Sequence, residues 1–100
     1  MQQQDLLNIT PPNNTDAERS VLGAVMQDSG AATLAVERLQ ADDFYSPEHQ
    51  EIFTAIKAVY SGGNPVDVMT VSNELSRRGT LDGIGGAPQV VHVVRSHHHA

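Results

Sequence analysis

The segment from Ser46 to Gly63 has the strongest apolar periodicity in the chain and restricts the fold more than any other feature. Apolar or ring-bearing side chains recur at helical spacing, at His49, Ile52, Phe53, Ile56, Val59 and Tyr60. Ser46 is a favoured N-cap residue, and Pro47 suits the first helical position because its missing N–H is not needed there. Gly62 and Gly63 are expected to end the helix. We therefore predict an amphipathic helix that must bury one face against other elements.

An earlier helix is predicted from Thr15 to about Gln27. Thr15 and Glu18 form the Thr-x-x-Glu pattern of a capping box. Val21, Leu22, Val25 and Met26 are expected to form a single apolar stripe, with Asp16, Arg19, Ser20 and Gln27 on the opposite, exposed face. Gly23 disfavours a helix interior, so we expect it to permit the close approach of another helix.

Three further helices are predicted, each shorter than the central one. Residues 31–39 follow a turn at 28–30, and their apolar surface comes from Ala31, Ala32, Leu34, Ala35 and Leu39. The link at 40–45 places Phe44 in the core. Another helix runs from about Thr70 to Arg78 and ends at Gly79. The last begins near Pro88 and buries Val90, Val91 and Val94, although this β-branched run also permits a strand.

Short connections and the lack of convincing strand pairs predict an all-α fold, a compact bundle of about five to six short helices. Residues 1–14 contain Pro11-Pro12-Asn13-Asn14 and are expected to be a flexible N-terminal arm. Residues 15–95 are expected to form the globular domain, and residues 96–100 a terminal tail.

Charge and composition exclude several classes of function. The net charge is −6 and the chain has a single lysine, Lys57, so no basic stripe is available to bind nucleic acid directly. There is no cysteine, and no apolar run approaches the ~20 residues of a membrane span. The start of the chain lacks the pattern of a secretory signal. These features predict a cytoplasmic protein that contacts other proteins.

No catalytic or cofactor motif is present. ATP hydrolysis by a P-loop needs Gly-x-x-x-x-Gly-Lys-Ser/Thr, and Lys57 has no such glycines before it. The carboxylates Asp42, Asp43, Glu48 and Glu51 are expected to cap and solvate helix ends, and Ser20, Ser46 and Ser76 lack the pattern of a hydrolase triad. His49 is expected to pack in the core with one ring nitrogen bonded to a carbonyl or carboxylate. We predict no catalytic, cofactor-binding or metal residue.

Histidines near the C-terminus are candidate metal ligands. His92, His97, His98 and His99 include three consecutive residues. Metal sites need ligands held on rigid elements and oriented by further contacts. No carboxylate partner lies nearby in the sequence, so a functional site is not favoured.

Six blocks, taken in order, resemble the N-terminal domain of DnaB-type replicative DNA helicases. They span roughly residues 11 to 90 and comprise Asp16–Ala24, Asp42–His49, the amphipathic helix after it, Gly63–Val71, Glu74–Gly79 and Leu81–Gly86. The resemblance implies a non-catalytic domain that supports assembly of a hexameric ring from dimers and that docks primase and the helicase loader. It also implies that a parent protein would use ATP and Mg²⁺ through a separate ATPase domain.

The resemblance places partner-binding residues on the surface of the globular domain. Asp16 and Arg19, near the start of the first helix, and Gln89, at the start of the last, are the positions expected to contact a partner. The family's helical hairpin would begin at about residues 96–100. Two alternatives remain at this point: a stand-alone phage or plasmid protein that mimics this domain to bind host replication proteins, and a small helical DNA-binding regulator.

Overall fold

The computed structural model describes residues 15–96, and these form five α-helices and two short 3₁₀ turns. The helices are α2 (Thr15–Val25), α3 (Ser29–Arg38), α4 (Pro47–Ser61), α5 (Val68–Arg78) and α6 (Ala87–Ser96), with turns η1 (Ala41–Asp43) and η2 (Asp82–Ile84) between them. No strand occurs within the described residues, so the all-α prediction is confirmed and the strand alternative near Pro88 was wrong. The predicted arm, residues 1–14, and residues 97–100 lie outside the described part.

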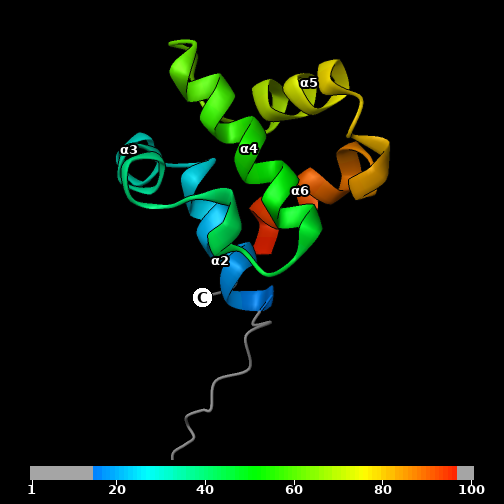
Figure 1. The fold of residues 1–100 in the computed structure, drawn as a ribbon, viewed down its shortest axis with the longest axis horizontal. Helices are drawn as coiled ribbons and strands as arrows, with labels where there is room; N and C mark the ends of the chain where they lie inside the picture. The colour runs from blue at the N-terminus through cyan, green and yellow to red at the C-terminus, as the bar shows by residue number, and fades with distance from the viewer. Residues whose placement is uncertain (1–14, 97–100) are drawn as a thin grey trace, which may run out of the picture.

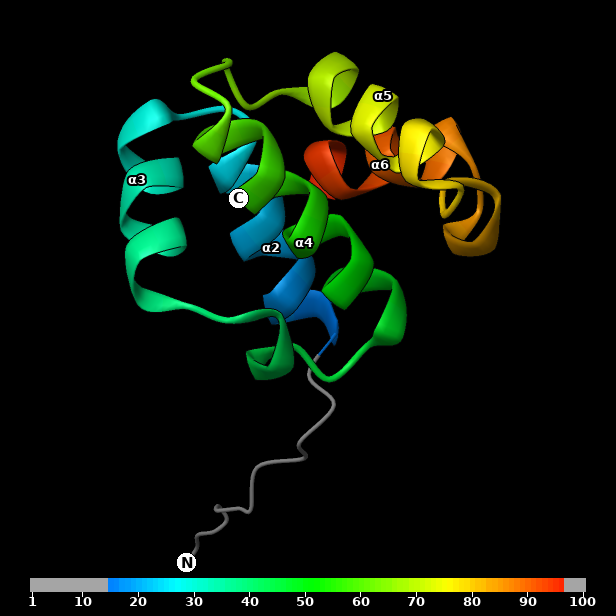
Figure 2. The ribbon, with the colours of Figure 1, turned by 45° about the horizontal axis from the view of Figure 1, so that its top comes forward.

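The helices are arranged around α4, the longest of them (Figure 1). Helix α2 lies alongside α4, while α3 packs on one flank and α5 and α6 occupy the other (Figure 2). The most extensive contacts join α2 to α6 and α4 to α5. Both ends of the described chain therefore belong to one packed unit, because the last helix closes against the first.

One contiguous core fills the space between these helices. It is mostly aliphatic and is formed by Leu22, Val25, Met26, Ala32, Ala35, Phe44, Ile52, Phe53, Ala55, Ile56, Val71, Leu75, Ile84, Val90 and Val93. The rings of Phe44 and Phe53 meet with centroids 5.1 Å apart and tilted by 37°, within the range of favourable aromatic pairs. Phe44 thus anchors the α3–α4 link in the core, as predicted.

Helix ends follow local side-chain chemistry. The Asp28 carboxylate accepts from the Gly30 N–H, so α3 begins at Ser29, two residues before the predicted start, and Asp28 is an N-cap. Asp67 and Thr70 form a reciprocal capping box that starts α5 at Val68. At the other end of α5, Gly79 has φ +79°, and the predicted glycine C-cap is confirmed.

Three predictions of burial were wrong, and each error concerns which side of a helix faces the core. Val21 lies beside Leu22 in the sequence but is 41% exposed, because consecutive residues project about 100° apart on a helix. Leu34 is 52% exposed for the same reason, since Ala32 and Ala35 occupy the buried face of α3. In α6 the buried valines are Val90 and Val93, at i and i+3, whereas Val91 is exposed and Val94 only partly buried.

Two glycines provide a matched test of backbone conformation. A Cβ at Gly79 or at Gly83 would meet nothing within 4 Å, but only Gly79 has a left-handed φ. Gly79→Ala should therefore lower the free energy of unfolding by about 1–2 kcal/mol through conformational strain alone. Gly83→Ala should change it by less than about 0.5 kcal/mol. Urea denaturation followed by circular dichroism measures both; equal effects would show that the αL cap is not what Gly79 contributes.

Candidate interaction site

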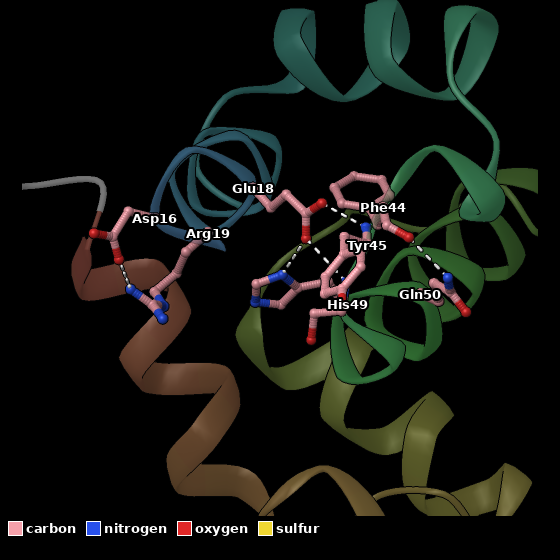
Figure 3. A network of polar contacts seen from close by, with 8 residues as sticks. Asp16, Glu18, Arg19, Phe44, Tyr45, His49 and Gln50 are labelled. Carbon is pink, nitrogen blue, oxygen red and sulfur yellow. Dashed lines mark hydrogen bonds and ion pairs between the residues drawn. The ribbon is translucent and has the colours of Figure 1, made fainter. Parts of the chain in front are cut away.

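The carboxylate of Glu18 connects α2 to the start of α4 (Figure 3). Its Oε2 accepts from the Tyr45 N–H at 2.5 Å, and its Oε1 accepts from the Ser46 N–H at 3.3 Å. These N–H groups precede the first turn of α4, where a negative charge is favoured by the helix dipole. Ser46 occupies the predicted N-cap position but its side chain makes no capping bond. Glu18, expected to cap its own helix with Thr15, instead caps α4.

His49 completes this junction. Its Nδ1 lies 2.9 Å from Glu18 Oε1, and its side chain is only 3% exposed. Because a carboxylate only accepts hydrogen bonds, Nδ1 carries the proton and donates it. The prediction that His49 packs in the core with one nitrogen bonded is confirmed, and its partner is a carboxylate on another helix.

The electrostatic state of Glu18 follows from these contacts. Burial of its side chain, which is 14% exposed, would raise the pKa of the carboxyl. The hydrogen bonds from Tyr45 N–H, His49 and Ser46 N–H act in the opposite direction and outweigh burial, so the pKa of Glu18 lies below its usual range. The folded state therefore favours the ionised carboxylate.

This shift gives a prediction about acid stability. A carboxyl whose pKa is lowered by folding stabilises the fold above its ordinary pKa, about 4.3, and loses that contribution as pH falls through the lower folded-state value. Glu18→Gln removes the charge and turns an amide NH₂ toward N–H donors, so it should lower the free energy of unfolding at pH 7 by about 1–3 kcal/mol. The difference between the two proteins should shrink toward pH 3.

Urea denaturation of both proteins at pH 7 and pH 3 measures the effect. Glu48→Gln is the control, because Glu48 is exposed in the first turn of α4 and forms no ion pair within residues 15–96. A Glu18→Gln effect that is the same at both pH values would contradict the account of a buried, ionised Glu18.

The predicted partner-binding residues Asp16 and Arg19 form an ion pair on the first turns of α2. Arg19 Nη1 lies 2.8 Å from Asp16 Oδ1, and Figure 3 shows the pair apart from the Glu18 junction. The Asp16 side chain is 90% exposed, as expected for a contact residue. Arg19 differs from expectation: its side chain is only 24% exposed, and its Nε is buried without a hydrogen-bond partner. Asp16 is therefore the accessible member of the pair.

Gln89 lies in the first turn of α6 and is half-buried. No hydrogen bond or ion pair within residues 15–96 joins it to Asp16 or Arg19. Helix α6 begins beside η2 and runs toward α2 (Figures 1 and 2). The contact at its other end is made by Gln27, whose Nε2 donates to the Val94 carbonyl at 3.1 Å. The structure thus joins Asp16 and Arg19 in an ion pair and places Gln89 on another helix, α6.

Charged groups elsewhere mostly serve local structure. Asp43 accepts from the Gln40 N–H at 2.7 Å, which makes it a cap. Arg77 and Arg78, the most basic pair in the sequence, both bond Glu74, at 2.6 and 3.5 Å. No cluster of three potential metal ligands occurs among the described residues, and His97–His99 lie outside them. Every helix in the described part is too short or too polar to cross a bilayer.

The role of Glu18 was missed by sequence reasoning. A Thr-x-x-Glu pattern at a helix start indicates a capping box, and nothing in that pattern shows that the carboxylate instead reaches residues 27 to 31 positions later. The sequence did contain one signal for this contact. His49 lies on the apolar face of its own helix and needs a polar partner, and Glu18 lies next to the apolar stripe of another helix.

The arrangement described so far is a small, acidic, all-α domain in which the polar cluster of Glu18 and His49 joins two helices. Residues 10–100 match the family described as the DnaB-like helicase N terminal domain. The chain belongs to this family.

Relatives and a solved structure agree with that assignment. The chain is 47% identical over 78 residues to the replicative DNA helicase DnaB of Mycobacterium leprae, and 42% identical over 93 residues to the replicative DNA helicase DnaC of Bacillus subtilis. These matches cover 78% and 92% of the chain but only 13% and 20% of the relatives. The crystal structure of the N-terminal domain of DnaB helicase from Mycobacterium tuberculosis superposes with a TM-score of 0.81 at 42% identity, covering 87% of this chain and 60% of that one.

Proposed function

We propose that this domain is the protein-docking and assembly part of a replicative 5′–3′ DNA helicase. It supports assembly of the hexameric ring and docks primase and the helicase loader. The observation that carries the proposal is the fold shared with a DnaB N-terminal domain at 42% identity over most of the chain. Helicase activity, with its ATP and Mg²⁺, belongs in this proposal to a separate domain of the parent protein, which acts in the cytoplasm.

The electrostatics of the surface support docking of proteins. The chain carries a net charge of −6, and its basic side chains are largely engaged within the domain. Arg77 and Arg78 share Glu74, and Arg19 is held by Asp16. A DNA-binding helix needs basic or amide side chains directed at the groove, so no observation favours the DNA-binding regulator.

Primase binding should depend on the exposed end of α2. Asp16→Lys reverses a charge on a side chain that is 90% exposed, and it also removes the ion-pair partner of Arg19, so circular dichroism should first confirm that the variant keeps its helices. We expect this variant to bind the primase encoded by the same genome about tenfold more weakly, a loss of about 1.4 kcal/mol. Isothermal titration calorimetry of each variant with primase measures the affinity.

The matched control for this charge reversal is Glu37→Lys. Glu37 is exposed in α3 and forms no ion pair within the described residues. The affinity of the Glu37→Lys variant for primase should stay within about twofold of that of the unsubstituted chain. Equal losses of affinity in both variants would indicate a general effect of net charge rather than a binding site at α2. Failure of the unsubstituted chain to bind primase would count against primase docking by this domain alone.

The domain should not bind DNA on its own. Phosphate neutralisation dominates non-specific DNA binding and is strongest at low salt, and in residues 15–96 three of the arginines are already paired with carboxylates. Fluorescence anisotropy of labelled single- and double-stranded oligonucleotides should therefore stay unchanged as the chain is added, even at low ionic strength. A saturable, salt-sensitive rise in anisotropy would contradict the proposed division of roles.

A further inference from the structure

A groove of about 330 Å³ lies between the start of α4 and the loop that joins α5 to η2. Helix α4 and η2 contact each other on this side of the molecule (Figure 2). The groove is at the lower end of the size range of ligand pockets, and it is lined by Pro47, Glu48, Gln50, Glu51, Gly79, Thr80, Gly83 and Ile84. Two of these residues are acidic and none is basic, so the groove is negatively charged.

The two carboxylates of this groove are neighbours without a partner. Glu48 and Glu51 lie three residues apart in α4, which places their Cβ atoms about 5–6 Å apart on one face of the helix. Neither side chain forms a hydrogen bond or an ion pair within residues 15–96. Glu48 is exposed, whereas Glu51 is half-buried and therefore less screened by water. A cation that bonds both would relieve their mutual repulsion.

The rest of the wall suits the carbon stem of a long side chain. Pro47 and Ile84 supply carbon surface, and Gly79 and Gly83 supply only main-chain atoms because glycine has no side chain. A Cβ at either glycine would meet nothing within 4 Å, so the space beside them is open. Long basic side chains lay their methylene groups along such surfaces while the charged end bonds elsewhere.

We propose that this groove docks an arginine side chain of a partner protein, held by Glu48 and Glu51. A guanidinium has five N–H donors in a planar fork and can bond two carboxylates at once, whereas a lysine offers a compact point charge. The chain already contains this chemistry, because Arg77 Nε and Nη2 bond the two oxygens of Glu74 at 3.2 and 2.6 Å. All six basic side chains of the sequence lie within residues 15–96 and none lines the groove, so the arginine must come from another molecule.

Charge favours a basic partner over a second copy of this chain. Each copy has a net charge of −6, so two copies repel each other, whereas a basic segment of another protein is attracted to the same surface. The proposal rests on the proposed docking function and adds the chemistry of a partner: a segment that presents an arginine to the start of α4.

Titration of the ¹⁵N-labelled full chain with an arginine peptide tests the proposal. The probe is the tripeptide Ala-Arg-Ala with both ends blocked, and binding is followed by the amide signals in NMR spectra. The signals of Glu51, Gly79 and Gly83 should shift saturably, while that of Glu37 in α3 should not. Replacing the arginine with citrulline, its neutral analogue, should abolish the shifts, and replacing it with lysine should weaken binding. Absent shifts, shifts spread over all acidic positions, or equal affinity for lysine would overturn the proposal.

Two variants of the chain separate charge from shape. Glu48→Gln combined with Glu51→Gln should weaken binding of the arginine peptide about tenfold or more. Glu37→Gln is the control, because it removes an exposed, unpaired carboxylate elsewhere, and it should leave the affinity unchanged. Gly83→Leu keeps every charge but places a side chain in the open space beside the groove, and it should also weaken binding. Circular dichroism confirms that each variant keeps its helices, and unchanged affinity in the double variant or in Gly83→Leu would contradict the proposed site.

Dilution of the chain without peptide tests the other occupant. The signals of Glu51, Gly79 and Gly83 should not depend on the concentration of the chain. A shift of these signals on dilution would mean that an arginine of a second copy occupies the groove, and the proposal of a different partner would be wrong. None of these measurements uses primase, so a failure of the groove proposal can be told apart from a failure of primase docking.

Discussion

The bond between the Glu18 carboxylate and the N–H groups before α4 sets the geometry on which the rest of the fold depends. Helix α4 supplies the largest share of the core, but the hydrophobic effect is non-directional and does not by itself set the position of the helix. The contacts at Tyr45, Ser46 and His49 fix the start of α4 against one turn of α2. With that end fixed, Phe44 in the α3–α4 link is positioned against Phe53 of α4.

Much of the fold could be predicted from local sequence patterns. The span of α4, the glycine stop of α5 and the burial of Phe44 and His49 each follow from spacing or from a residue's own conformational preference. The errors have one physical origin. At Val21, Leu34 and Val91 the sequence shows an apolar side chain on a helix, and only the position of the neighbouring helices decides which side of the apolar stripe is covered.

The partner of Glu18 could not be predicted for a related reason. The residues around Glu18 in the sequence already suggest a role for it, as a cap at the N-terminus of its own helix. A local sequence pattern cannot show that the carboxylate instead bonds residues of another helix. Asp16 was placed correctly on the surface by its position opposite the apolar stripe. Arg19 was not, because its side chain is only 24% exposed and its Nε is buried.

The distribution of charge and apolar surface links the fold to its use. Ion pairs within the domain engage Arg19, Arg77 and Arg78, which leaves an acidic surface with little attraction for phosphate. The aliphatic core is small, and apolar residues such as Val21, Leu34 and Met69 remain exposed. A domain of this size buries a smaller fraction of its unfolded-chain surface than a larger domain does, and it gains stability from whatever binds its folded state. In the proposed assembly, exposed apolar residues such as these would gain by packing against a neighbour, because burial removes their carbon surface from water.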